Sequence, residues 1–435
     1  MTNFPLTKPK EEKMKAKNFF TYLFSLILVS FFTISVQAAE PIRIGHIDPF
    51  SGPIAATGLE GMENFKLAIE RINARGGVLG GRMIELVPLD NAMKAEKTTQ
   101  QVKKAIDSGI RFITQGIASS HALNIIKTLN KHNKRNPDQA VVYFNHSAVT
   151  PAFTNEMCSF WHFRTDADVD MKISALVTQL GKNPKIKKLY MLNQNYVYGK
   201  AVQSAANKYL KERAAHVELV GDDLMIPFGK VQDFTPYVAK IASSKADAVI
   251  TGNWGVDFTR FVVEVAGAGL DVEFYSIYAG IPNSLNAYGE EAGIKLKIKQ
   301  ISEAHMNDED RQEVIDFNKA NLEKYKRTWY ADRYRLTMEL FAAALEKAGT
   351  DDHVAVAYAL EGMTLPGPHG DKIVMRADNH QIAMPMAVSE IDTNAAHKFV
   401  YNDKPFGIGW KTAGWVSTAE NTLPTTCKMK RPPRP

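Results

Sequence analysis

The chain has 435 residues but only two cysteines, and it lacks a strong excess of either charge. Its formal net charge is +6, and residues 1–38 hold five lysines against two acids, which leaves about +3 on the rest. So small a charge gives no electrostatic reason to expect nucleic-acid binding. Hydrophobic residues make up 45% and charged residues 23%, close to the globular average, which excludes a disordered or a collagen-like chain.

The sequence also lacks the short motifs of common enzyme classes. It contains no G-x-S-x-G elbow, Walker loop or H-E-x-x-H motif. The glycine pairs at 76–77 and 80–81 follow a helical pattern instead of opening one, so they form no dinucleotide fingerprint. His121 and His146 could approach each other, but a polar packing role is favoured over a catalytic or metal role. We therefore expect a protein that is not an enzyme and has no cofactor or metal.

Long apolar runs are confined to the N-terminus. Two lysines precede the apolar stretch 19–36, which leads into a Val-Gln-Ala site ending at Ala38. We interpret residues 1–38 as a secretory signal peptide cleaved near Ala38, with either Met1 or Met14 as the start. A retained membrane anchor is the alternative, and the serines and threonines within the stretch argue against it.

Both cysteines lie in the part of the chain that would be exported. When an exported chain has only two cysteines, they usually form a disulfide in the oxidising compartment. We therefore predict a disulfide between Cys158 and Cys427 that holds the C-terminal end in place. Two buried free thiols are the alternative. The basic, proline-rich tail 427–435 is expected to be a disordered end.

From residue 42 onward, short apolar runs alternate with longer amphipathic segments, which is typical of parallel βαβ units and predicts an α/β fold. The alternation begins again after Arg164, which indicates a second domain on the same plan. The expected strands are 42–47, 83–89, 112–115, 141–145, 188–192, 218–224, 248–252, 274–278 and 298–303. Helices are expected between them and at 311–325, 330–348 and 354–363, followed by hairpin strands over 367–391.

In combination, several short motifs resemble the branched-chain amino-acid-binding proteins, the leucine/isoleucine/valine-type periplasmic solute-binding proteins of ABC importers. They are Ser51-Gly52-Pro53, the helix end Ile72-Asn73-Ala74-Arg75-Gly76-Gly77, Gly116 with Ser119-Ser120, Ala148 with Pro151 and Thr154, Phe163-Arg164-Thr165, and Tyr198-Gly199. The resemblance implies a type I periplasmic binding fold of two lobes, each a mostly parallel sheet flanked by helices, joined by a three-stranded hinge.

The expected lobe boundaries follow from the resemblance. The N-terminal lobe would comprise 39–165 and 280–377, and the C-terminal lobe 166–279 and 378–426. The three crossings would lie near Thr165, Ala279 and Ala377.

Ligands of open parallel sheets bind beyond the carboxyl ends of the strands. Ser119 and Ser120 precede the helix 122–133, so their hydroxyls and its first N–H groups are expected to hold a carboxylate, as the resemblance implies; an ordinary helix cap is the alternative. The resemblance places a backbone group of Ala148 at the ligand. Val149 stands where the family usually has a hydroxyl residue, which removes one expected hydrogen bond.

On the second lobe, the expected ligand contacts are Tyr198, Asn253, Trp254 and Tyr278, of which the aromatic rings offer large contact areas. Packing of these rings between the lobes is the alternative. Amino-acid receptors of the family carry an acid after the strand 274–278, for the ligand ammonium, but no acid stands there in this chain. Either Asp257 or another acid substitutes, or the ligand is an organic acid, such as an aromatic acid, which is favoured slightly over leucine.

The resemblance therefore implies a monomeric periplasmic receptor that closes on a small carboxylate ligand and delivers it to the membrane permease of an ABC importer. A sensor that presents its closed form to a signalling partner is the alternative.

Overall fold

The computed structural model describes residues 1–3, 5, 40–226, 229–328 and 331–435. The chain divides into two compact units, Met1–Glu40 and Pro41–Pro435, and the helices and strands described here lie in the second. Most of the expected signal peptide 1–38, with its cleavage site near Ala38, lies among residues 6–39, outside the described part. Within the described residues, no helix is long and apolar enough to cross a bilayer.

The first sheet contains five strands in the order β2-β1-β3-β4-β5, and all neighbouring pairs are parallel. The strands are β1 (Ile42–His46), β2 (Ile84–Pro88), β3 (Phe112–Gln115), β4 (Val142–Asn145) and β5 (His162–Arg164). Its helices are α2 (Ala55–Ala74), α3 (Ala95–Asp107), α4 (Ser119–Arg135), α10 (Gln312–Tyr325), α11 (Arg333–Ala348) and α12 (His353–Leu360).

Alternation along β3 explains why helices cover both faces of this sheet. Phe112 contacts Phe341 of α11, with ring centroids 4.8 Å apart. Ile113 points to the other face, where it shares a buried core with Val102 of α3 and Ile125 of α4. A strand that is buried on both faces has a continuous run of apolar residues, and such a run predicted the strand over 112–115.

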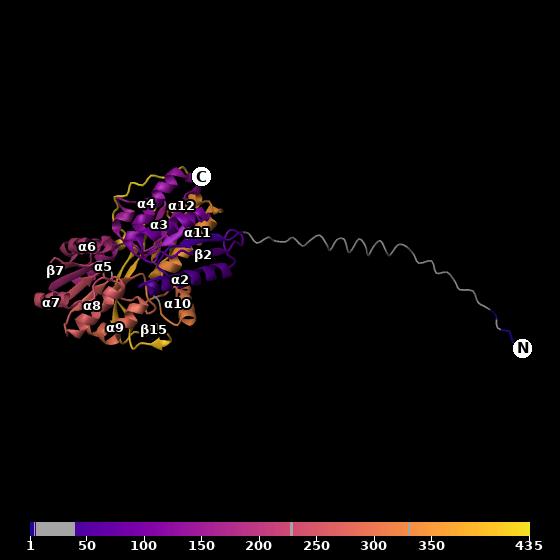
Figure 1. Cartoon of the computed structure of the whole chain (residues 1–435). Coiled ribbons are helices and arrows are strands. Elements are labelled where there is room, and N and C mark those ends of the chain that lie inside the picture. The colour runs from indigo at the N-terminus through magenta and orange to yellow at the C-terminus, as the bar shows by residue number, and fades with distance from the viewer. Residues whose placement is uncertain (4, 6–39, 227–228, 329–330) are drawn as a thin grey trace. The chain divides into compact units, whose positions relative to one another are not determined.

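The second sheet contains seven strands in the order β17-β14-β10-β9-β8-β6-β7. Its strands are β6 (Lys188–Gln194), β7 (Glu218–Met225), β8 (Ala248–Thr251), β9 (Glu273–Ser276), β10 (Lys299–Ser302), β14 (Met386–Asp392) and β17 (Gly409–Val416). Its helices are α5 (Val169–Gly181), α6 (Val197–Arg213), α7 (Thr235–Ser244), α8 (Gly255–Gly267) and α9 (Pro282–Lys295). Figure 1 shows these helices grouped apart from α3, α4, α11 and α12.

Both sheets have the same strand order. The order β2-β1-β3-β4-β5 recurs as β7-β6-β8-β9-β10, and β14 and β17 extend the second sheet in antiparallel orientation. The predicted α/β fold with a repeated plan is thereby confirmed. In such sheets the ligand crevice lies where the strand order reverses, which here is between β1 and β3 and between β6 and β8.

The strand over 298–303 does not belong to the first lobe, where we expected it. Strand β10 pairs in parallel with β9 and antiparallel with β14, and Lys299 Nζ donates to Glu273 Oε2 at 2.9 Å. A strand after a helix has the same sequence pattern on either lobe, so the pattern could not assign it. We propose that the second crossing lies between β10 and α10 instead of near Ala279.

The segment 367–391 is divided between two sheets. β11 (Thr364–Pro366), β12 (Lys372–Met375) and β13 (Ile382–Ala383) form a small antiparallel sheet, whereas β14 joins the seven-stranded one. We propose that the third crossing follows Ala383, a few residues beyond the expected Ala377. Beside it, Arg164 N donates to His380 O at 2.9 Å, next to the crossing expected near Thr165.

The C-terminal tail packs on the first lobe, and the expectation of a disordered end is wrong. The structure confirms the disulfide between Cys158 and Cys427. Beyond it, Tyr358 Oη donates to Pro432 O at 2.6 Å, and Arg431 Nε lies 3.0 Å from Glu361 Oε1. Residues 423–426 were expected with the second lobe, but this segment starts on the first, since Arg376 Nη1 donates to Leu423 O at 2.6 Å.

Helix α2 carries a buried carboxyl group that makes stability depend on pH. Glu60 is 3% exposed, and Arg327 lies 3.7 Å from it. Burial raises the pKa of the Glu60 carboxyl from 4.5 to about 7, although Arg327 opposes the shift. The folded protein therefore holds this proton to higher pH than the unfolded chain does, so stability falls as the pH rises from about 4.5 to about 7.

We expect Glu60→Gln to remove this loss, which is on the order of 3 kcal/mol. Urea unfolding of the wild type and the variant at pH 4.5 and pH 7.5 measures this loss of unfolding free energy. The variant should gain unfolding free energy relative to the wild type at the higher pH. A difference between the two proteins that is the same at both pH values would contradict the assignment.

Candidate ligand-binding site

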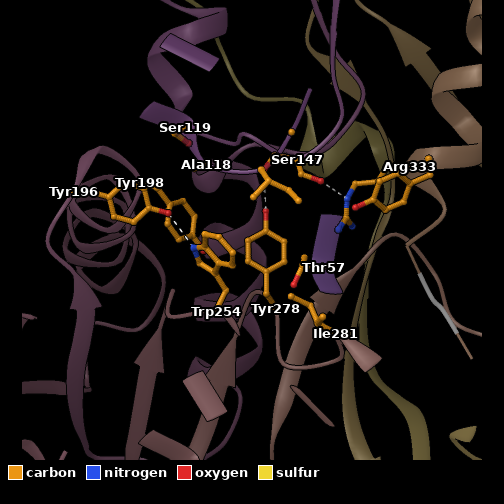
Figure 2. Close-up of a pocket in the computed structure, with 13 residues that line it drawn as sticks. Thr57, Ala118, Ser119, Ser147, Tyr196, Tyr198, Trp254, Tyr278, Ile281 and Arg333 are labelled. Atoms are coloured by element: carbon orange, nitrogen blue, oxygen red, sulfur yellow. Dashed lines mark hydrogen bonds between the residues drawn. The ribbon is translucent and has the colours of Figure 1, made fainter. Parts of the chain in front are cut away.

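A cavity opens at the carboxyl ends of the strands, between the two sheets. Residues of both lobes line it: Thr57, Gly116, Ile117, Ala118, Ser119, Ser147, Arg333 and Tyr334 from the first, and Tyr196, Tyr198, Trp254, Tyr278 and Ile281 from the second (Figure 2). Four of the seven predicted ligand residues are among them, namely Ser119, Tyr198, Trp254 and Tyr278.

The loop after β3 presents the N-terminus of α4 to the cavity. Ser119 is the first residue of α4 and is 2% exposed. The N-cap residue before it is Ala118, and its side chain forms no capping hydrogen bond. Ala118 has φ of +72°, an unfavourable conformation for a residue other than glycine, which marks a backbone held by its surroundings. The N–H groups of a first helical turn lack intrahelical acceptors, so this end can bind an anion.

Three predicted ligand residues do not line the cavity. Ser120 lies one position further along α4. Both backbone groups of Ala148 are occupied by Asn145, whose Oδ1 accepts from Ala148 N and whose Nδ2 donates to Ala148 O, each at 2.8 Å. Ser147, one residue earlier, lines the cavity instead.

Asn253 is the third of these residues. It is fully buried, and its Nδ2 lies 3.1 Å from the sulfur of Met225. Alignment of short loops can slip by one residue, and side-chain direction at a strand end is set by packing that sequence alone does not show. Trp254, the next residue, reaches the cavity.

Four aromatic rings form the wall contributed by the second lobe. Trp254 Nε1 donates to the hydroxyl of Tyr196 at 2.9 Å, and Tyr278 Oη donates to Ser147 O at 3.3 Å, which joins the two lobes (Figure 2). The hydroxyl of Tyr198 is buried and has no hydrogen-bond partner among the described residues. Burial raises its pKa well above the ordinary value, so it remains a neutral hydroxyl that can donate to a ligand.

Arg333, the first residue of α11, brings a positive charge to the cavity. Its Nε donates to Ser147 Oγ at 2.7 Å and its Nη1 to Glu303 Oε1 at 2.8 Å. Its guanidinium lies over the rings of Tyr278 and Tyr334, 5.9 and 5.4 Å from their centroids. Although burial opposes it, the neighbouring Glu303 carboxylate raises the pKa of Arg333, which stays charged.

No carboxylate is among the described residues that line this cavity. Asp257, the acid that we considered as a partner for an ammonium, accepts from Gln194 Nε2 at 2.7 Å and from Gly229 N at 3.0 Å, and it does not line the cavity. Glu303 lines an adjoining cavity that shares Tyr278 and Arg333 with the first.

Sequence reasoning missed Tyr196, Ser147 and Arg333. Tyr196 and Ser147 each lie within two residues of a predicted ligand residue. The sequence therefore identified the correct loops, and including their flanking residues would have found both. Arg333 gave no signal, since it begins a helix almost 200 residues from Ser147, and only the tertiary fold brings the two together.

Comparison with known proteins gives consistent results. A model of the family described as periplasmic binding protein matches residues 41–397. The Leu/Ile/Val-binding protein homolog 4 of Brucella melitensis is 30% identical over 412 residues, 91% of this chain and 94% of that protein.

Solved structures show the same fold. The leucine-, isoleucine-, valine-, threonine- and alanine-binding protein of Brucella ovis in its closed conformation has a TM-score of 0.81 at 28% identity, over 91% of this chain and all of that one. A solute-binding protein of an ABC transporter from R. palustris in complex with benzoate has a TM-score of 0.70 at 20% identity, over 89% of this chain and 99% of that one.

Proposed function

Since the chain belongs to the periplasmic binding protein family, we propose that its two lobes close around a small organic acid, preferably an aromatic one. It is a solute-binding receptor of the kind that serves ABC importers. The observation that carries the ligand class is the charge of the cavity wall. Arg333 is the one charged side chain among the described lining residues, and it is positive.

A carboxylate fits this wall and an ammonium does not. The N-terminus of α4 with Ser119 and the guanidinium of Arg333 both favour an anion. An ammonium group in the same cavity would be buried without a counter-charge, which is costly. The rings of Tyr196, Tyr198 and Trp254 supply the flat apolar surface that an aromatic ligand packs against.

An amino acid is the second candidate, and one observation favours it. Glu303 Oε2 is buried without a hydrogen-bond partner among the described residues, and the residue lines the adjoining cavity. A ligand ammonium that passed Arg333 would meet this oxygen. The names of relatives that bind leucine, isoleucine and valine support this candidate. Solute-binding proteins of the same fold have been solved in complex with benzoate and 4-hydroxybenzoate, which supports the organic-acid candidate.

Transport fits the family better than sensing does. In the proposed cycle, residues 1–38 are removed on export, the monomeric receptor binds its ligand in the periplasm, and the closed form docks on a membrane permease. Ligand affinity that is higher in the closed state drives the closure. Reconstitution with an ABC permease from the same genome, followed by uptake of labelled ligand, distinguishes delivery from signalling.

A thermal-shift panel on refolded, ligand-free protein starting at Ala39 tests the ligand class. Benzoate and hydroxybenzoates, aliphatic carboxylates, leucine and phenylalanine are compared at equal concentrations. A ligand that binds only the native state raises the melting temperature by mass action. We expect aromatic acids to raise it and leucine not to. Stabilisation by leucine but not by benzoates would establish the amino-acid candidate.

The adjacent serines of α4 provide a matched pair of variants. Because Ser119 lines the cavity and Ser120 does not, Ser119→Ala should weaken binding of the best acid about tenfold, the loss expected for one hydrogen bond to a charged group. Ser120→Ala should bind as the wild type does. Isothermal titration calorimetry measures both, and equal affinities of the two variants would show that Ser119 does not hold the ligand.

A further inference from the structure

Three side chains that can bind a metal meet behind the wall of the ligand cavity. His46 ends β1, Asp48 follows two residues later, and His146 follows β4 directly. Their exposures are 0%, 1% and 0%. Nε2 of His46 lies 2.9 Å and Nε2 of His146 lies 3.3 Å from the same oxygen, Asp48 Oδ2. One nitrogen of each histidine and one carboxylate oxygen all lie within 4.8 Å of one another.

Neighbouring groups orient Asp48 and His146, whereas Nδ1 of His46 is buried without a hydrogen-bond partner among the described residues. Asp48 Oδ1 accepts the backbone N–H of Ile117 at 2.9 Å, which leaves Oδ2 facing the histidines. Nδ1 of His146 lies 2.9 Å from Thr114 Oγ1, which leaves its Nε2 facing the carboxylate. Metal-binding histidines characteristically use one ring nitrogen for such an orienting hydrogen bond and the other for the metal.

Asp48 places one carboxylate between the two histidines of the cluster. Among the described residues, Asp48 forms ion pairs with these two histidines and with no lysine or arginine. A cation held between the three side chains would compensate the charge of a buried carboxylate. The ring of Phe65 packs edge-on against both imidazoles, with centroids 4.8 and 4.9 Å away, so the surroundings are apolar.

We propose that His46, Asp48 and His146 bind a divalent first-row cation of the zinc class. Two imidazole nitrogens and one carboxylate oxygen are the donors that Zn²⁺, Co²⁺ and Ni²⁺ share. Coordination at the usual distance of about 2.0–2.2 Å draws the two rings closer together around the carboxylate. The cation takes the place of a direct contact between the rings and Asp48.

Such a cation would brace two loops that line the ligand cavity. The loop after β3 bonds to Asp48 through Ile117, and a Cβ on Gly116 would lie 2.5 Å from the His146 ring, so this loop rests on the cluster. Ser147, which contacts Arg333, follows His146 directly. The metal site does not depend on the ligand class, and its test needs no organic ligand.

The test uses untagged protein, refolded in the presence of a chelator, dialysed and then exposed to Zn²⁺, with the excess removed by gel filtration. We expect elemental analysis to find about one equivalent of zinc, and the melting temperature to rise with Zn²⁺ but not with Mg²⁺. Co²⁺ should give visible bands of a nitrogen and oxygen site without thiolate charge transfer, since both cysteines are bonded.

Matched variants locate the site. His46→Gln and His146→Gln should lose the retained zinc while keeping wild-type circular dichroism. His121→Gln removes a buried histidine that contacts Asn91, and His369→Gln removes a surface histidine near Asp308; both should keep the zinc. Wild-type protein that retains no zinc overturns the proposal, as does a surface variant that loses it. If both cluster variants fail to fold, absence of the Co²⁺ bands from wild-type protein overturns it.

Discussion

Arg333→Gln is expected to lower the affinity for the best organic acid about 100-fold. The guanidinium lines the cavity, is nine-tenths buried and is held by Ser147 and Glu303, so it is positioned to meet a ligand carboxylate. Truncating one partner of a buried charged pair costs about 2–5 kcal/mol, and each 1.4 kcal/mol is tenfold in affinity. Calorimetric titration with the acid identified by the thermal-shift panel measures the change.

The same substitution also leaves Glu303 as a buried charge without its partner. We therefore expect a loss of unfolding free energy of about 3–5 kcal/mol. The double variant Arg333→Gln with Glu303→Gln separates the two effects. It should recover most of the stability and none of the affinity.

The amino-acid candidate predicts the opposite result in the same experiment. Removal of Arg333 would expose Glu303 to the cavity and strengthen binding of an amine-bearing ligand. An Arg333→Gln protein that binds leucine more tightly and is indifferent to benzoate would reject the organic acid.

Removal of the disulfide should have the second large effect. Cys158 and Cys427 are 269 residues apart, and a loop of that size gives a chain-entropy estimate of roughly 5 kcal/mol, an upper figure. We expect the Cys158→Ser, Cys427→Ser protein to lose about 2–5 kcal/mol of unfolding free energy in urea. Wild-type protein under a reductant should show the same loss.

Limited proteolysis reports the tail itself. In the wild type, the segment after α13 (Thr418–Asn421) is held by the disulfide and by Tyr358 and Glu361. The serine variant should be cut in this segment at lower protease concentrations. Tyr358→Phe, which removes one hydrogen bond to the tail, is the control and should change neither stability nor cleavage by much. If the serine variant resists cleavage, noncovalent contacts alone hold the tail.

The repeated fold could be predicted because its signal is local. A strand buried on both faces, such as β3, appears as a short apolar run, and a helix such as α4 has apolar residues at helical spacing. The pairing of β10 could not be predicted, since its four buried residues suit either sheet. In the structure β10 pairs with β9 and β14, and Lys299 of β10 forms an ion pair with Glu273 of β9.

The candidate site was predictable in its loops but less so in its side chains. Ser119 and Trp254 face the cavity, whereas their neighbours Ser120 and Asn253 do not. Adjacent residues point in different directions, so an error of one position exchanges a ligand contact for a buried structural group. The sequence cannot resolve that difference, because backbone angles such as φ of Ala118 depend on tertiary contacts.

The sequence by itself determined the α/β class and its repeated plan, because periodicity is a local property, and its resemblance to the family pointed to two lobes and to the rings of Tyr198, Trp254 and Tyr278. The tertiary structure decided the charge of the cavity. Arg333 reaches Ser147, and His146 reaches Asp48, only after helices and strands far apart in the chain have packed. Electrostatic recognition depends on distances between such residues, and sequence spacing does not encode them.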